Sequence, residues 1–203
     1  MPALDPTPDQ LEATLKRSVA ALEDARIPYL LGGSLASWAR GGPQTRNDLD
    51  LMVRPEHAEQ ALSALEEAGM KPERPPEDWL LKAWDGDVLV DLIFHPSGLA
   101  LDDEVFARSE RLRVLGMNVD VLSIEDVVIT KLMAIDEHAI RYESLLQIAR
   151  ALREQVDWAA VRSRTAGSAF SRPFFVLLEE LEILETRPPR ENTVRVLGAR
   201  EAN

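Results

Sequence analysis

The sequence contains no cysteine, and this absence excludes disulfide bonds and metal sites built on thiolates. It also contains no apolar run that approaches the roughly 20 residues needed by a membrane-spanning helix. Its start, MPALDPTPDQ, lacks the basic residues and apolar centre of a signal peptide. We therefore expect a cytoplasmic protein with no membrane partner.

Basic residues are in the minority, with 23 Lys and Arg against 35 Asp and Glu and a formal net charge of −12. Attraction of the whole surface to nucleic acid or anionic lipid is excluded, because phosphate binding needs clustered Lys and Arg. A local basic face remains open, as does a simple balance with neighbouring glutamates. The arginines concerned are Arg141, Arg150, Arg153, Arg162, Arg164, Arg172 and Arg187.

Several common catalytic motifs are missing as well. The sequence has no G-x-x-x-x-G-K-[ST], no G-x-G-x-x-G and no H-E-x-x-H. Its three histidines, His57, His95 and His138, fall in different predicted elements. Nothing in the sequence therefore supports a zinc site or a Ser-His-Asp triad.

The chain is long enough, with 203 residues of which 45% are hydrophobic, to bury a substantial core. Its periodicity changes from mixed to helical near Ser123. We predict an α/β (α+β) fold, with a catalytic core at 1–122 built on a mixed sheet with flanking helices and a C-terminal helical bundle at 123–203. In the core we expect helices at 7–28, 34–40 and 55–70, strands at 29–31, 48–53 and 117–123, and a hairpin around Asp85-Gly86.

Two acids interrupt an apolar strand in the segment DLDLMV. Asp48 and Asp50 leave the same face of a strand, with Cβ atoms about 6 to 7 Å apart. Carboxylates at that separation can hold two divalent cations spaced roughly 3.5 to 4 Å apart, and their hard oxygen atoms favour Mg²⁺ or Mn²⁺. The alternative is an ordinary pair of acids on the solvent face of a strand.

A third acid, Asp91, lies within the apolar run VLVDLIF, where an unpaired buried carboxylate would be costly. If this strand lies beside DLDLMV, three carboxylates converge on one spot. Otherwise Asp91 ends a strand and meets solvent or an arginine.

The segment Gly32-Gly33-Ser34 follows the first predicted strand and precedes a short helix. Glycines let the backbone approach a ligand closely, the start of a helix offers free N–H groups, and Ser34 adds a hydroxyl. Tight turns use the same residues. The order of strand, Gly-Gly-Ser, helix, Asp-x-Asp strand and later lone Asp is the more specific signal.

With this order the segment from Ile27 to Phe94 resembles the nucleotidyltransferase superfamily related to DNA polymerase β. The following segment, VLSIEDVVITKLMAI, is similar to AbiEii-type and MenT-type toxins of bacterial toxin–antitoxin systems. These toxins often continue with an acidic R-D-x-x-D-L helix. Here RYESLLQIARAL has Glu143 and Gln147 at the positions where aspartates are usual.

The resemblance implies a role for each matching residue. Asp48, Asp50 and Asp91 would hold two Mg²⁺ or Mn²⁺ ions, with Asp91 nearest the acceptor hydroxyl that it helps to deprotonate. The resemblance also implies a set of nucleotide-binding residues: Gly32, Gly33, Ser34, Arg46, Lys131 and, as a substitute acid, Glu143. For Lys131 an ordinary helix-surface lysine beside Asp126 is the alternative.

Three functions are compatible with these residues. The first, which we favour because of the SIEDVVITKLMA segment and the arginine-bearing helices, is a toxin-like nucleotidyltransferase that uses a nucleoside triphosphate (NTP) to modify the 3′ end of tRNA, with a cognate antitoxin as a further partner. The second is a small-molecule nucleotidyltransferase of the aminoglycoside or lincosamide kind, which the acidic composition favours. The third is an inactive nucleotide- or antitoxin-binding module, which would have lost one of the three acids.

Two further features concern regulation and substrate contact. Phosphorylation of Ser34 would compete with the incoming triphosphate, so this residue is a candidate site for silencing by an antitoxin. Trp79 and Trp84 flank the strands of the predicted site and are either core residues or base-stacking platforms.

Overall fold

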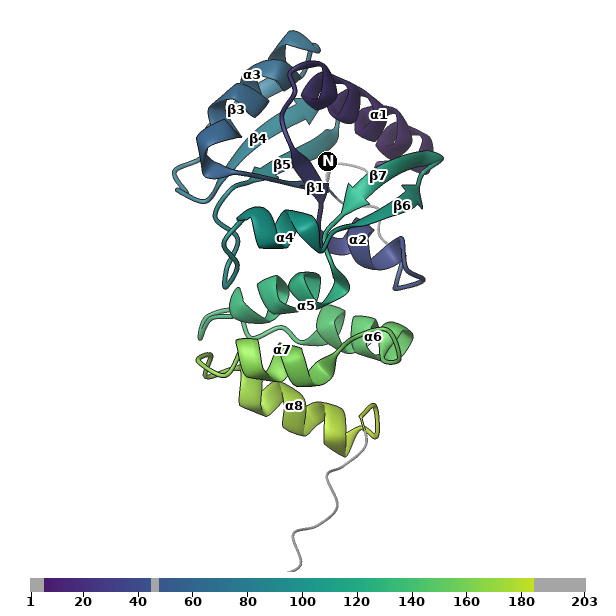
Figure 1. Ribbon diagram of the computed structural model, residues 1–203, viewed down its shortest axis with the longest axis vertical. Helices are drawn as coiled ribbons and strands as arrows, with labels where there is room; N and C mark the ends of the chain where they lie inside the picture. Colours follow the sequence, from purple (N-terminus) through teal and green to yellow (C-terminus); the bar gives the residue numbers. More distant parts are fainter. Residues whose placement is uncertain (1–5, 45–47, 185–203) are drawn as a thin grey trace, which may run out of the picture.

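A seven-stranded mixed sheet forms the upper part of the computed structural model, which describes residues 6–44 and 48–184 (Figure 1). The strand order is β3-β4-β5-β2-β1-β7-β6. The strands are β1 (Tyr29–Leu31), β2 (Leu49–Val53), β3 (Lys71–Glu73), β4 (Leu80–Asp85), β5 (Val88–Ile93), β6 (Glu110–Val114) and β7 (Met117–Val121). The mixed sheet with helices confirms the predicted fold class.

The helices of the sheet region come mainly from the first half of the chain. They are α1 (Pro8–Asp24), α2 (Gly33–Trp38), α3 (Ala58–Glu67) with a preceding 3-10 turn at Pro55–His57, and α4 (Asp103–Ala107). The rest of the described chain forms α5 (Ile124–Met133), α6 (Glu143–Leu152), α7 (Trp158–Arg164) and α8 (Ser171–Glu180). No helix of the described residues is long and apolar enough to cross a lipid bilayer.

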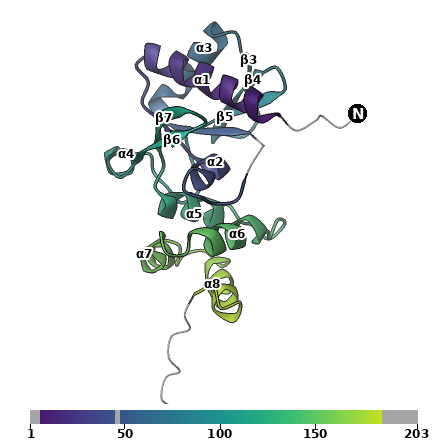
Figure 2. The same ribbon diagram turned by 90° about the vertical axis from the view of Figure 1, so that its right-hand side faces the viewer.

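The two faces of β4 separate core packing from the polar surface of the sheet. Side chains alternate along a strand, so Asp85 and Ala83 share one face while Lys82 and Trp84 share the other. Thr14 of α1 donates a hydrogen bond to Asp85 at 2.8 Å, which identifies the face covered by α1. Figures 1 and 2 show α1 and α3 at the end of the molecule away from α5–α8. The functional site is therefore expected on the other face, to which Lys82 and Trp84 of β4 belong.

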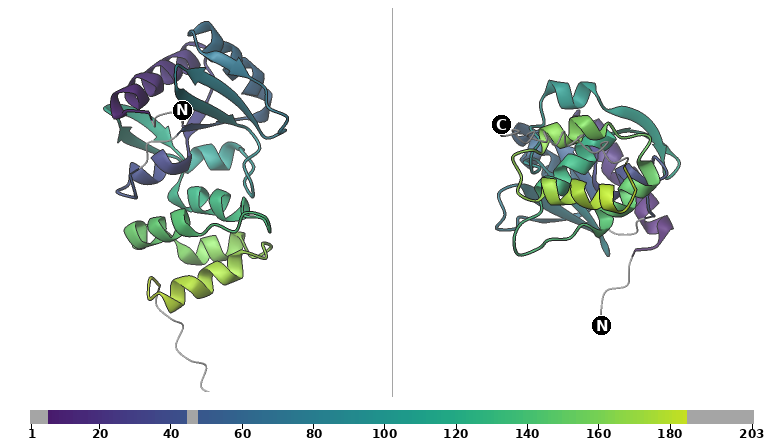
Figure 3. Two further views of the ribbon diagram at one scale, coloured as in Figure 1. Left: turned by 180° about the vertical axis from the view of Figure 1, so that it is seen from behind. Right: turned by 90° about the horizontal axis from the view of Figure 1, so that it is seen from below.

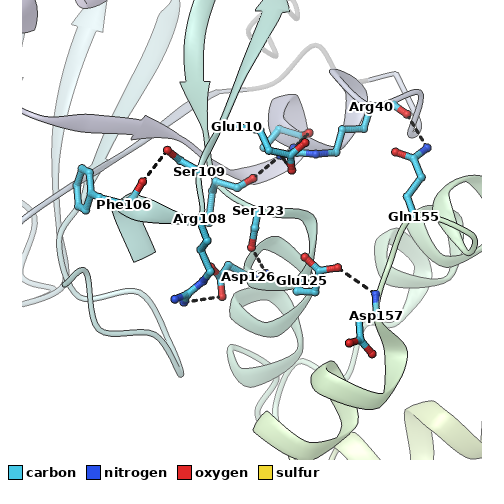
Figure 4. Close-up of polar contacts among 12 residues, drawn as sticks. Arg40, Phe106, Arg108, Ser109, Glu110, Ser123, Glu125, Asp126, Gln155 and Asp157 are labelled. Atoms are coloured by element: carbon cyan, nitrogen blue, oxygen red, sulfur yellow. Dashed lines mark hydrogen bonds and ion pairs between the residues drawn. The ribbon is translucent and has the colours of Figure 1, made fainter. Parts of the chain in front are cut away.

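Helix α5 joins the sheet to the remaining helices. Ser123 caps its first turn by accepting the Asp126 N–H at 3.2 Å. The Asp126 carboxylate is fully buried and pairs with Arg108, which follows α4 (Figure 4). It also pairs with Arg164 of α7. Helices α5–α8 lie together below the sheet in Figure 3. The start of α5 is thus fixed by contacts from both parts of the chain.

Candidate active site

Parallel pairing of β2 and β5 brings the three predicted acids together. Asp50 lies directly opposite Asp91 in the register, and Asp48 immediately precedes β2. Asp48, Asp50 and Asp91 each offer a carboxylate oxygen, and these oxygens lie within 4.8 Å of one another. The strands that carry Asp50 and Asp91 are therefore neighbours in the sheet, as the convergence of the acids requires.

Negative charge at this cluster is incompletely balanced by the protein. Burial, followed by repulsion from Asp48, raises the pKa of Asp50 to about 7, although Lys131 and Lys82 oppose the shift. Burial also raises the pKa of Asp91, whose residue is only 8% exposed. Carboxylates held this close are stabilised by a divalent cation, and oxygen-only donors match the preference of Mg²⁺ or Mn²⁺. The residues present therefore fit the expected metal.

The glycine turn after β1 lies directly against Asp50. The Gly32 N–H donates to the Asp50 carbonyl at 2.8 Å. Gly33 has a φ of 58°, and a Cβ atom there would lie 1.6 Å from the Asp50 Oδ2 atom. Only glycine combines this backbone conformation with this close approach. A side chain at position 33 would therefore displace the Asp50 carboxylate, and glycine avoids this overlap.

Ser34 and Lys131 meet from opposite parts of the chain. Ser34 lies in the first turn of α2, and Lys131 lies in the last turn of α5. The Lys131 Nζ atom is 3.4 Å from the Ser34 Oγ atom, within hydrogen-bonding range. A cationic group and a hydroxyl thus stand beside Gly33, where they can contact phosphate oxygens.

Lys82 is a further charged residue of the site. Its Nζ atom lies 2.9 Å from Asp91 Oδ1, and the two residues face each other across the β4–β5 ladder. The turn of this hairpin consists of Gly86 and Asp87, one position later than predicted. With the predicted turn at Asp85-Gly86, Leu80 would lie opposite Asp91. Lys82 can therefore be assigned to the site only when the correct register of the hairpin is known.

A cavity of about 380 Å³ adjoins the acid cluster. Its lining includes Gly33, Asp50 and Lys131. Apolar residues, among them Met52 and Ile93, line it as well. The site therefore combines a charged region with an adjacent apolar pocket.

One predicted residue is not brought into this cluster, and another is not described by the structure. Glu143 is the first residue of α6, is exposed, and belongs neither to the acid cluster nor to the cavity lining. Arg46 falls outside the described residues. The structure thus assembles Asp48, Asp50, Asp91, Gly32, Gly33, Ser34 and Lys131 at one place.

Residues 9–182 match the family model described as "Uncharacterised nucleotidyltransferase". No curated protein sequence matches the chain. The match to the family model covers most of the chain, including every residue of the assembled cluster.

Solved structures show a similar fold. The solution structure of the antibiotic-resistance factor ANT(2'')-Ia has 19% identity and a TM-score of 0.60, covering 87% of this chain and 98% of its own. The crystal structure of ANT(2'')-Ia with adenylyl-2''-tobramycin has 18% identity and a TM-score of 0.59, covering 81% and 98%. An antigenic nucleotidyltransferase-like protein from Paracoccidioides brasiliensis has 18% identity and a TM-score of 0.53, covering 84% and 88%. At these identities the similarity concerns the fold.

Proposed function

Because this chain belongs to the family of uncharacterised nucleotidyltransferases, we propose that it transfers a nucleoside monophosphate from an NTP to an acceptor hydroxyl. Asp48, Asp50 and Asp91 would hold two Mg²⁺ or Mn²⁺ ions. The convergence of these three carboxylates within 4.8 Å is the observation that carries the proposal.

Each residue of the cluster has a place in this reaction. Gly33, Ser34 and Lys131 would hold the phosphates by backbone approach, hydroxyl contact and charge. The bound ions would neutralise phosphate charge and make the acceptor hydroxyl more acidic.

Asp91 accepts the acceptor proton on the carboxylate oxygen that Lys82 does not occupy. The acceptor oxygen forms a bond to the α-phosphorus as the bond to the β-phosphate bridging oxygen breaks. Pyrophosphate leaves with that electron pair.

A small molecule that bears hydroxyl groups is the favoured acceptor. Several of the arginines considered for a local basic face are paired with acids in the described structure. These pairs are Arg153–Glu154, Arg162–Glu179 and Arg164–Asp126. The net charge of −12 favours a cationic acceptor. ANT(2'')-Ia has a similar fold, and its crystal structure contains adenylyl-2''-tobramycin. This structure supports the choice of a small-molecule acceptor by analogy.

Modification of the tRNA 3′ end is the second candidate, with a cognate antitoxin as partner. The contact of Lys131 with Ser34 supports it, because the AbiEii/MenT resemblance assigns this lysine to the nucleotide. A silent binding module is the least favoured, since all three acids are present and close together.

Labelled acceptors distinguish these functions. Purified protein is incubated with Mg²⁺ and each α-labelled NTP, together with total tRNA or a panel of aminoglycosides and lincosamides. We expect label on a small molecule, lost in Asp48→Ala and retained in Asp87→Ala, whose exposed acid lies in the β4–β5 turn. Label on tRNA alone would establish the second candidate, and no label on any acceptor would refute transferase activity toward both classes.

A further inference from the structure

We propose that Trp79 stacks on the base of the bound NTP and that the cavity beside Asp50 is its nucleoside pocket. This inference rests on the proposed nucleotidyl transfer and adds a residue that selects the nucleoside part of the substrate. Trp79 is the last residue before β4, lines the cavity and is 41% exposed.

The two strands beside the cavity carry acidic and apolar residues in an order that matches the groups of a nucleotide. Asp50 lines the cavity together with Gly33 and Lys131, which would hold phosphate charge. Met52 and Ile93 follow Asp50 and Asp91 by two positions on the same strands, so they share a sheet face with those acids. Two residues advance a strand by about 6 to 7 Å, a spacing comparable to the ribose that separates the α-phosphate from the base.

The apolar part of the cavity has the chemistry and size expected for a base. Met52, Ile93 and Pro96 line it together with Trp79. A volume of about 380 Å³ is within the range of small-molecule pockets and accommodates a base with its ribose. Every base offers a flat π face to an indole, and such stacking contributes to affinity without a hydrogen-bond code.

The backbone of Trp79 is fixed even though its ring is exposed. Its carbonyl accepts hydrogen bonds from the N–H groups of Phe94 at 3.0 Å and His95 at 3.2 Å. An exposed indole on an anchored backbone can form a platform with little loss of main-chain entropy on binding.

Trp84, at the other end of β4, serves a different purpose. Its Nε1 atom donates to Glu73 at 2.7 Å, and it does not line the cavity. Of the three clustered acids, only Asp50 lines the cavity, together with Gly33 and Lys131, which would hold the phosphates in the proposed reaction. We therefore assign the cavity to the nucleotide.

Equilibrium binding of nucleotide analogues tests this assignment. Isothermal titration with Mg²⁺ and each of the four α,β-methylene NTP analogues measures binding without turnover, and inorganic tripolyphosphate serves as a probe of the phosphate end alone. We expect Trp79→Ala to weaken the best analogue about 10-fold, because stacking contributes about 1 to 3 kcal/mol per base and 1.4 kcal/mol corresponds to tenfold. Trp79→Phe should retain most of the affinity, and tripolyphosphate should bind Trp79→Ala as tightly as wild type.

Trp84→Ala is the matched control and should bind the analogues like wild type. Unchanged analogue affinity in Trp79→Ala, with normal binding by wild type, would overturn the stacking role and leave nucleotidyl transfer intact. An equal loss of tripolyphosphate affinity would also overturn it, since the ring would then act on the whole site. Failure of folded wild-type protein to bind any analogue would refute both the stacking role and the proposed function.

Discussion

Gly33 shows how closely the backbone and the acid cluster are fitted at the scale of single residues. Its φ of 58° is a conformation that side chains disfavour, and an added Cβ would overlap Asp50. We expect Gly33→Ala to lower transfer at least 10-fold and to reduce the free energy of unfolding by about 1 to 3 kcal/mol. Urea unfolding and the labelling assay measure the two effects.

Gly86→Ala is a matched control for this substitution. Gly86 has a φ of 62°, but an added Cβ there would meet no atom within 4 Å. Gly86→Ala should lower the free energy of unfolding because of backbone strain, but it should leave nucleotidyl transfer unchanged. Equal activity loss in both variants would show that displacement of Asp50 is not the cause.

The raised pKa of Asp50 predicts a pH dependence of stability in the metal-free protein. Its pKa rises from 3.8 to about 7 because of burial and repulsion from Asp48. Between these values the native state binds the proton more tightly than the unfolded state, so stability falls as pH rises through this window. We expect the Tm of wild type in EDTA to fall between about pH 4 and pH 7, and to fall less in Asp50→Asn.

Thermal unfolding with and without Mg²⁺ checks the origin of this slope. Bound Mg²⁺ should flatten the decline in wild type, because a cation stabilises the ionised carboxylates. The same decline in Asp50→Asn would assign it to other groups.

At the scale of elements, the start of α5 depends on a buried ion cluster. Burial alone would raise the pKa of Asp126, but hydrogen bonds from Arg108 and Arg164 outweigh it and hold the pKa below its ordinary value. Asp126→Asn should therefore lower the free energy of unfolding by about 1 to 3 kcal/mol, because it weakens charge-assisted hydrogen bonds to two arginines that are each about one third exposed. Urea titration at pH 7 measures this loss.

Acid tests the same contact in wild type. A depressed carboxyl pKa stabilises the native state above the ordinary value near 3.8, and this contribution disappears as pH falls through the lower native value. The difference between wild type and Asp126→Asn should therefore shrink toward low pH. Asp157→Asn, at an exposed helix cap, is the control and should cost less than about 1 kcal/mol, because Asn caps a helix about as well as Asp.

Elements with a strong apolar period could be predicted from the sequence, whereas edge strands could not. Helix α1 repeats buried residues at helical spacing, and β5 is almost wholly apolar. Strands β3 and β6 lie at the two edges of the sheet, and most of their residues are exposed. Such strands carry no clean alternation, and β3 contains Pro72, which is tolerated at an edge.

The site shows the same division between local and long-range information. The Gly-Gly-Ser turn and the three acids carry local signals that predict chemistry. The place of Lys82 opposite Asp91 depends on a hairpin register that moves with one turn residue. The contact of Ser34 with Lys131 spans 97 positions, so the family resemblance indicated Lys131 where periodicity could not.

At the scale of the whole molecule, the proposed phosphate contacts come from two parts of the chain. Ser34 belongs to a helix beside the sheet, while Lys131 belongs to the helix that leads into α6–α8. A bound triphosphate would therefore link the sheet to the helical part, and unfolding of either part would release it.

This arrangement predicts that Mg²⁺ with an α,β-methylene NTP analogue raises the Tm of the whole chain in one transition. At 100 times the Kd, ligand binding adds about 2.7 kcal/mol, which corresponds to about 5 to 10 °C for a chain of this size. Lys131→Met removes one charge contact, and a tenfold weaker Kd would leave roughly half of the stabilisation at the same ligand concentration.

Lys71→Met, at an exposed position of β3, is the control, and the ligand should raise its Tm in differential scanning calorimetry as much as that of wild type. A full shift in Lys131→Met would remove α5 from the nucleotide site, and two separate transitions would show that the ligand does not join the two parts.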